Sequence, residues 1–113
     1  MRADARGRPA ACEDALARAL AAAHDALAAK IALIETEQAA GALTPQQAAG
    51  RARAAQAVYE RDCALARVAA DTGWHTWAGV GGILYGRRER TSPPKVVRAA
   101  DADGLRAAIE AQS

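Results

Sequence analysis

The chain has 113 residues, a length that accommodates one domain or a short domain with an appendage. Its apolar fraction of 51% consists mostly of alanine, with no Phe and only two Trp, so a monomer would bury little apolar surface and its stability would be marginal. The net charge of +2 at pH 7 is too small to indicate a strongly charged partner by itself, and two cysteines are too few for a disulfide framework. We therefore expect a cytoplasmic protein with reduced thiols that associates with another chain.

The first predicted elements are a flexible arm and a long helix. Residues 1–9 contain three arginines and no apolar periodicity, which indicates a flexible basic arm. From Ala10 onward, large apolar residues recur at steps of three and four once Ala23 is included, which is the spacing of one stripe on an α-helix. Gly41 can adopt the left-handed conformation that ends a helix, so we expect the helix to end at about Ala40. The large members of the stripe are Leu16, Leu20, Leu27, Ile31 and Ile34.

A second helix is predicted from Pro45 to about Ala70. Thr44 supplies a capping hydroxyl, Pro45 suits the first helical position, and Gln47 completes a capping box. Because only a few residues separate the two helices, they are expected to form an antiparallel hairpin over residues 10–72. The facing stripe of the second helix is mostly alanine, and its larger members are Val58, Tyr59 and Leu65.

The hairpin is expected to associate with a second copy. Large residues on the first helix would face alanines on the second, which favours a close approach of the two helix axes. A single hairpin still leaves apolar side chains such as Leu33 without cover. Pairing two hairpins in a four-helix bundle would cover them, so the sequence predicts a homodimer whose core contains the large residues of both stripes.

Residues 73–113 differ in character, because glycine and proline replace much of the alanine. Residues 83–85 and 95–98 have the composition of short strands, which we expect to pair antiparallel. Asp101 is placed to cap a last helix that carries Leu105 and Ile109 on one face. The predicted fold is therefore mainly α: a long antiparallel helical hairpin followed by a small strand–strand–helix unit.

The sequence contains no recognisable set of residues for catalysis or metal binding. The two histidines and two cysteines lack the spacing that places ligands on one ion, and no Ser–His–Asp or Cys–His pair is suggested. The glycines within residues 79–82 precede a strand and lack a following Gly-Lys-Ser/Thr, unlike a phosphate-binding loop. We predict a non-enzymatic protein without a metal or cofactor. The uncharged residues 72–86 fall short of the ~20 apolar residues of a membrane span, so no membrane partner is expected.

Two groups of residues in the C-terminal region are candidates for ligand contact. The first is a small aromatic pocket made by Trp74, His75, Trp77 and Tyr85. The second is a basic loop over residues 87–98 that could contact phosphates while the aromatic rings stack on exposed bases. The cations of this loop are Arg87, Arg88, Arg90, Lys95 and Arg98.

These observations support more than one function. The leading hypothesis is a small interaction or regulatory protein that self-associates through its hairpin and can recruit another protein. The alternative is a small nucleic-acid-binding accessory protein that uses the basic loop. The small net charge and the lack of a recognised DNA-binding motif disfavour this alternative. A third hypothesis is a small-molecule or enzyme site in the aromatic pocket.

Overall fold

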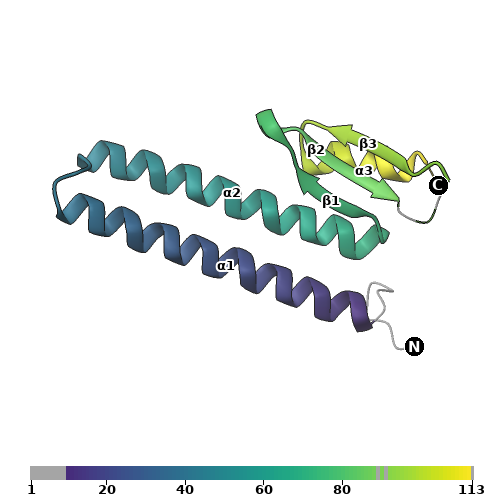
Figure 1. The fold of residues 1–113 in the computed structure, drawn as a ribbon, viewed down its shortest axis with the longest axis horizontal. Coiled ribbons are helices and arrows are strands. Elements are labelled where there is room, and N and C mark those ends of the chain that lie inside the picture. The colour runs from purple at the N-terminus through teal and green to yellow at the C-terminus, as the bar shows by residue number, and fades with distance from the viewer. Residues whose placement is uncertain (1–9, 89, 91, 113) are drawn as a thin grey trace. The chain divides into compact units, whose positions relative to one another are not determined.

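The computed structural model describes residues 10–88, 90 and 92–112, so the predicted basic arm at residues 1–9 lies outside the described part of the chain. The elements in chain order are α1 (Ala10–Ala39), α2 (Pro45–Thr72), β1 (His75–Ala78), a short 3-10 helix (Val80–Gly82), β2 (Leu84–Arg88), β3 (Lys95–Ala99) and α3 (Ala102–Glu110) (Figure 1). The predicted mainly α fold, with two long helices before a small unit of strands and a helix, is confirmed.

The chain divides into two compact units. The hairpin unit contains residues 18–63, and the C-terminal unit contains residues 64–112 together with residues 10–17. This division cuts both long helices, whereas the boundary predicted from the sequence lies at residue 73. No helix in the described part of the chain is long and apolar enough to cross a membrane.

The turn of the hairpin is closed by local backbone and side-chain bonds. Gly41 has a φ of +78°, and the Ala42 N–H donates to the Glu37 carbonyl at 2.9 Å, so the last carbonyls of α1 gain donors. At the start of α2, the Gln47 N–H donates to Thr44 Oγ1 at 3.1 Å and the Thr44 N–H donates to Gln47 Oε1 at 2.9 Å. The predicted capping box is therefore confirmed.

Replacing Thr44 by alanine should lower the free energy of unfolding of the protein by about 1 kcal/mol, because an orphan N–H at the start of α2 loses its acceptor. Thr36→Ala is the matched control. The Thr36 hydroxyl bonds the Ala32 carbonyl at 3.0 Å within α1, and such mid-helix bonds do not stabilise helices. Urea unfolding followed by far-UV circular dichroism measures both. Equal losses in the two variants would contradict a capping role for Thr44.

The hairpin unit has its own small core near the turn. Ile34, Leu43 and Ala48 are buried there, and Ile31 and Ala52 pack against them. Arg51 of α2 bonds Glu37 of α1 at 3.2 Å, which links the two helices at their surface. Farther from the turn, Leu20 and Leu27 are only half-buried. The predicted stripe is thus deeply buried at Ile34 near the turn and again at Leu16, which is 7% exposed, and only half-buried between them.

The C-terminal unit is built on a three-stranded antiparallel sheet with the strand order β1-β2-β3. The predicted antiparallel pairing of the two later segments is correct. β2 begins one residue after the start of the predicted segment 83–85 and extends three residues beyond its end, to Arg88. The strand β1 was not predicted. Between β1 and β2, the Gly79 N–H donates to the Ile83 carbonyl at 2.8 Å and closes the connecting turn.

One face of this sheet makes the main core of the C-terminal unit. Its buried members come from the end of α2, the sheet and α3: Leu65, Val68, Trp74, Leu84, Leu105 and Ile109. α3 lies against this face (Figure 1). Its N-cap is Asp101, as predicted, and the Asp101 side chain accepts a hydrogen bond from the Gly104 N–H at 2.7 Å. Arg106 of α3 also bonds Asp71 of α2 at 3.0 Å.

The position of Leu65 differs from its predicted role. The sequence assigned Leu65 to the stripe of the dimer core, but it is 6% exposed within the core of the C-terminal unit. The reason is that the end of α2 packs against the sheet, and Thr76 of β1 donates to the Leu65 carbonyl at 3.0 Å. Leu65 is therefore not available to a second hairpin.

Candidate functional site

The face of the sheet that points away from α3 is exposed. Because side chains alternate along a strand, the pairs Trp77–Tyr85, His75–Arg87 and Tyr85–Arg98 lie on one face, together with Val96 opposite Arg87. We call this surface the open face, defined by His75, Trp77, Tyr85, Arg87, Val96 and Arg98. Trp77 and Tyr85 are half-buried and the other four side chains are exposed, with Val96 at 55%.

Three aromatic rings form a continuous stack on the open face. The ring centroids of His75 and Trp77 are 5.4 Å apart at 27°, and those of Trp77 and Tyr85 are 5.4 Å apart at 12°. At the Tyr85 end of the stack, a Cβ placed on Gly79 would lie 2.5 Å from Tyr85 Cε2, so the tyrosine ring lies directly against the glycine backbone. The stack is thus closed at Tyr85, and its other end is the exposed His75.

The sheet carries positive charge only. Its three strands contain four cations and no Asp or Glu. Arg87 and Arg98 belong to the open face, and Arg88 and Lys95 form a cross-strand pair on the other face. Cations held on one small sheet without intervening carboxylates create a local positive potential, even though the net charge of the chain is small.

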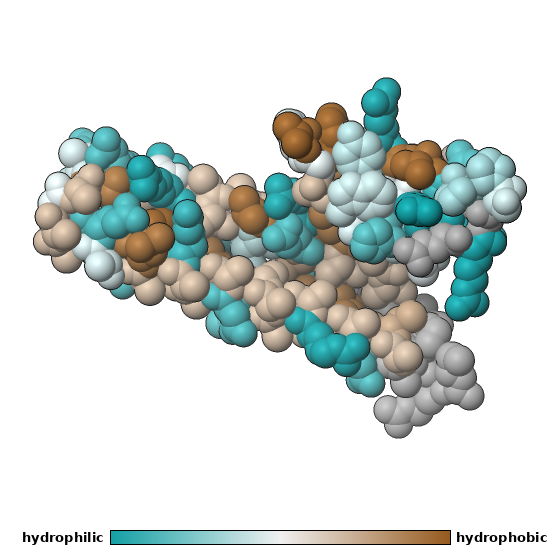
Figure 2. Space-filling model, viewed as in Figure 1, coloured by the Kyte–Doolittle hydropathy of each residue, from teal (hydrophilic) through white to brown (hydrophobic). Residues whose placement is uncertain are grey.

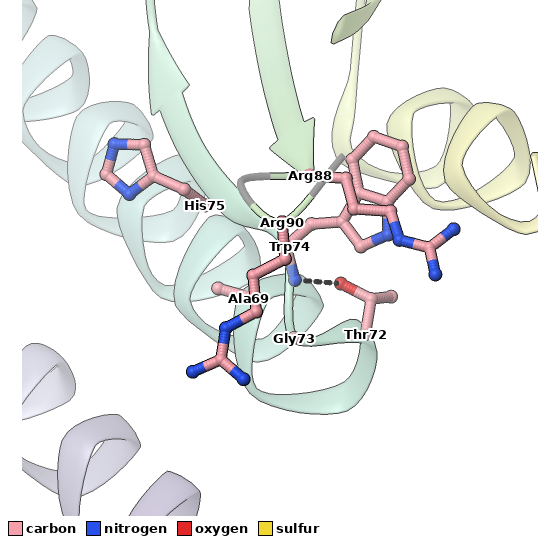
Figure 3. A pocket seen from close by; sticks show the side chains of 7 residues that line it. All are labelled: Ala69, Thr72, Gly73, Trp74, His75, Arg88 and Arg90. Carbon is pink, nitrogen blue, oxygen red and sulfur yellow. Dashed lines mark hydrogen bonds between the residues drawn. The ribbon is translucent and has the colours of Figure 1, made fainter. Parts of the chain in front are cut away.

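The predicted aromatic pocket is divided between the two faces of the sheet. Trp74 precedes β1 and is 7% exposed in the core, whereas Trp77 and Tyr85 belong to the open face. Trp74 and His75 instead border a pocket of about 840 Å³ whose other lining residues are Ala69, Thr72, Gly73, Arg88 and Arg90. In Figure 3 the rings of His75 and Trp74 point to opposite sides. The backbone N–H of Trp74 donates to Thr72 Oγ1 at 3.2 Å.

The predicted basic loop is divided in the same way. Arg88 and Arg90 line the pocket beside Trp74, and Figure 3 shows their guanidinium groups pointing in different directions. Arg87 and Arg98 lie on the open face beside the aromatic stack. The five cations therefore do not form one cluster, and only two of them accompany the stacked rings.

The hairpin unit carries a second candidate surface. A groove of about 200 Å³ runs between α1 and α2, and most of its lining residues are apolar. We call it the hairpin groove; its lining residues are Ala23, Ala26, Leu27, Lys30, Ala55, Val58, Tyr59 and Asp62. Val58 is 45% exposed and Leu33, one turn beyond Lys30, is 49% exposed. Figure 2 shows the long helices dominated by the pale brown of weakly hydrophobic residues, with hydrophilic side chains between them.

The histidines and cysteines do not gather into a site. On α1, His24 Nδ1 lies 3.8 Å from Asp25 Oδ1. Cys12 and Cys63 are free thiols. Within the described ranges, no three His, Cys, Asp or Glu side chains are close enough to hold a metal ion.

The open face was missed from the sequence because β1 was missed. The spacing of His75 and Trp77 by two residues was the available signal, since this spacing places two side chains on one face of a strand. It was obscured by Trp74, which adds an aromatic residue on the other side.

No protein-family model, no curated protein and no solved structure matches this chain.

Proposed function

We propose that this protein is a non-enzymatic interaction protein that self-associates through its helical hairpin, with the hairpin groove as the centre of the contact. The observation that carries this proposal is the apolar lining of the groove, with Val58 at 45% exposure in its wall. Large aliphatic side chains left at the surface of a small domain are stabilised when a partner covers them. Leu33 extends the same side of α1 by one further turn.

The charges around the hairpin groove suit a second copy of the same chain. Lys30 lies about 4.5 Å along the helix axis from Leu27, toward the turn, and Asp62 lies about 6 Å from Val58 in the opposite direction. A two-fold axis across the middle of the groove brings Lys30 of one copy to the axial level of Asp62 on the other. Glu37 and Arg51, nearer the turn, already neutralise each other at 3.2 Å.

Four helices in this arrangement would form the bundle expected from the sequence. The partner contributes the apolar surface that Leu27, Val58 and Leu33 lack within one hairpin. Because Leu65 is enclosed in the C-terminal unit, the proposed contact extends from the turn to the groove and does not use the end of α2.

Sedimentation equilibrium should give the parent chain a mass of twice 11.7 kDa at micromolar concentration. Val58→Glu should shift this mass to that of the monomer, because a carboxylate in the contact would lose its water without gaining a partner. Val80→Glu is the matched control, since Val80 is 99% exposed in the turn before β2, and it should leave the dimer intact. Circular dichroism checks that both variants keep their helices.

A parent chain that stays monomeric throughout this concentration range would refute the proposed function. A Val58→Glu variant that still dimerises would show that the contact lies elsewhere.

A further inference from the structure

The open face of the sheet combines stacked rings with arginines, and this combination has no role in the self-association proposed above. We propose that the open face binds single-stranded nucleic acid, with a base stacking on the free end of the aromatic column and backbone phosphates held by Arg87 and Arg98. The proposal concerns the C-terminal unit only, so it does not depend on the hairpin groove.

The aromatic column supplies a stacking surface with one free end. Tyr85 closes the column on Gly79, while His75 is exposed at the opposite end and has Arg87 as its cross-strand neighbour. An unpaired base placed on His75 would extend the stack by one ring. Every base has an aromatic face, so such stacking tolerates many sequences.

The two arginines of the open face are spaced to contact successive phosphates of one nucleic-acid strand. Arg98 lies opposite Tyr85, and Arg87 lies opposite Val96, so the two arginines are diagonal neighbours about 7–8 Å apart along β2 and β3. Both arginines belong to the face of the sheet that carries the aromatic column. No strand of the sheet contributes a carboxylate that would repel a phosphate.

Other ligands match this face less well. A DNA duplex keeps its bases stacked on each other, so it could use the arginines but not the aromatic column. An acidic peptide would also engage the charges alone. A neutral sugar could lie on the rings, but none of the residues of the open face is a carboxylate that would accept its hydroxyl groups. A flexible nucleic-acid strand has both unpaired bases and phosphates, so it can use both the aromatic column and the arginines.

Binding is measured with a fluorescein-labelled oligothymidine of twelve nucleotides, by fluorescence anisotropy at several salt concentrations. With two phosphates neutralised, the logarithm of the association constant should fall against the logarithm of salt with a slope of about −1.4. Emission of Trp77 should be quenched on binding. A Trp77→Leu variant, which retains Trp74 in the core, should lose this quenching.

Two sets of variants separate stacking from charge. His75→Leu should weaken binding roughly 5- to 150-fold through loss of the ring on which a base stacks, whereas His75→Phe, which keeps an aromatic ring there, should bind as the parent does. Arg87→Gln and Arg98→Gln should each reduce the magnitude of the salt slope by about 0.7. Arg67→Gln is the matched control, because Arg67 is exposed on α2 outside the sheet, and it should leave the slope unchanged.

Three outcomes would overturn the proposal. The first is no anisotropy change for the parent chain at low salt. The second is equal binding of a DNA duplex or of a polyglutamate peptide, which would show that charge alone is recognised. The third is an unchanged affinity in His75→Leu together with an unchanged slope in both open-face arginine variants. Because His75, Arg87 and Arg98 are all exposed, these variants should keep the fold of the parent, and circular dichroism checks this. The mass of the protein in solution reports separately on the proposed function.

Discussion

Leu105→Ala should lower the free energy of unfolding of the C-terminal unit by about 2–5 kcal/mol. Leu105 is the most deeply buried side chain of this unit, with 0% exposure, and it packs among Trp74, Leu84 and Ile109. Truncation removes the transfer free energy of three carbons and leaves a cavity that the sheet and α3 cannot fully close. In a small domain of marginal stability, a loss of this size unfolds a large fraction of the molecules at ordinary temperature.

Guanidinium unfolding followed by tryptophan emission measures this effect, because Trp74 belongs to the same core. Val80→Ala is the control. Val80 is 99% exposed, so its truncation should change stability by less than about 0.5 kcal/mol. A loss below about 1 kcal/mol in Leu105→Ala would mean that α3 does not pack on the sheet as described.

Gly86→Leu should destabilise the C-terminal unit by about 1–3 kcal/mol or more, through overpacking. A Cβ at Gly86 would lie 3.1 Å from Ile109 Cδ1 and 3.5 Å from Leu105 Cδ1. The missing side chain therefore allows α3 to approach the middle of β2. A leucine places three further carbons beyond that Cβ, in space already filled by α3, so the helix or the strand must move.

Val96→Leu is the matched control for this substitution. Val96 is 55% exposed on the open face of the neighbouring strand, where a larger side chain meets solvent instead of a helix. Its free energy of unfolding, measured in the same way, should stay within about 0.5 kcal/mol of the parent. If Gly86→Leu were as stable as Val96→Leu, close packing between β2 and α3 would be refuted.

The two proposals assign separate tasks to the two units of the chain. The hairpin unit offers an apolar groove, which suits a second copy, and the C-terminal unit offers an aromatic and basic sheet face, which suits an anionic strand with flat bases. A dimer would carry two open faces. Linking two weak sites in one assembly raises the overall affinity for a long strand when both can be reached at once, so dissociation by Val58→Glu should also weaken binding of long oligonucleotides more than of short ones.

The sequence by itself determined the features that depend on neighbours within a few residues. The capping box at Thr44, the left-handed stop at Gly41 and the cap at Asp101 each join groups three to five residues apart. The two long helices and their antiparallel connection follow from periodicity and a short turn for the same reason. These interactions form whatever the distant chain does, which is why local patterns predicted them.

Only the tertiary structure decided which side chains form the core and which remain exposed. Leu65 has the spacing of a hairpin residue but lies in the core of the C-terminal unit, and Trp74 is buried in that core whereas Trp77 belongs to the open face. These outcomes depend on the pairing of β1 with β2 and on the packing of α3 against Gly86, which join residues well separated in sequence. The open face exists because that pairing turns His75, Trp77 and Tyr85 to one side, and α3 covers the other.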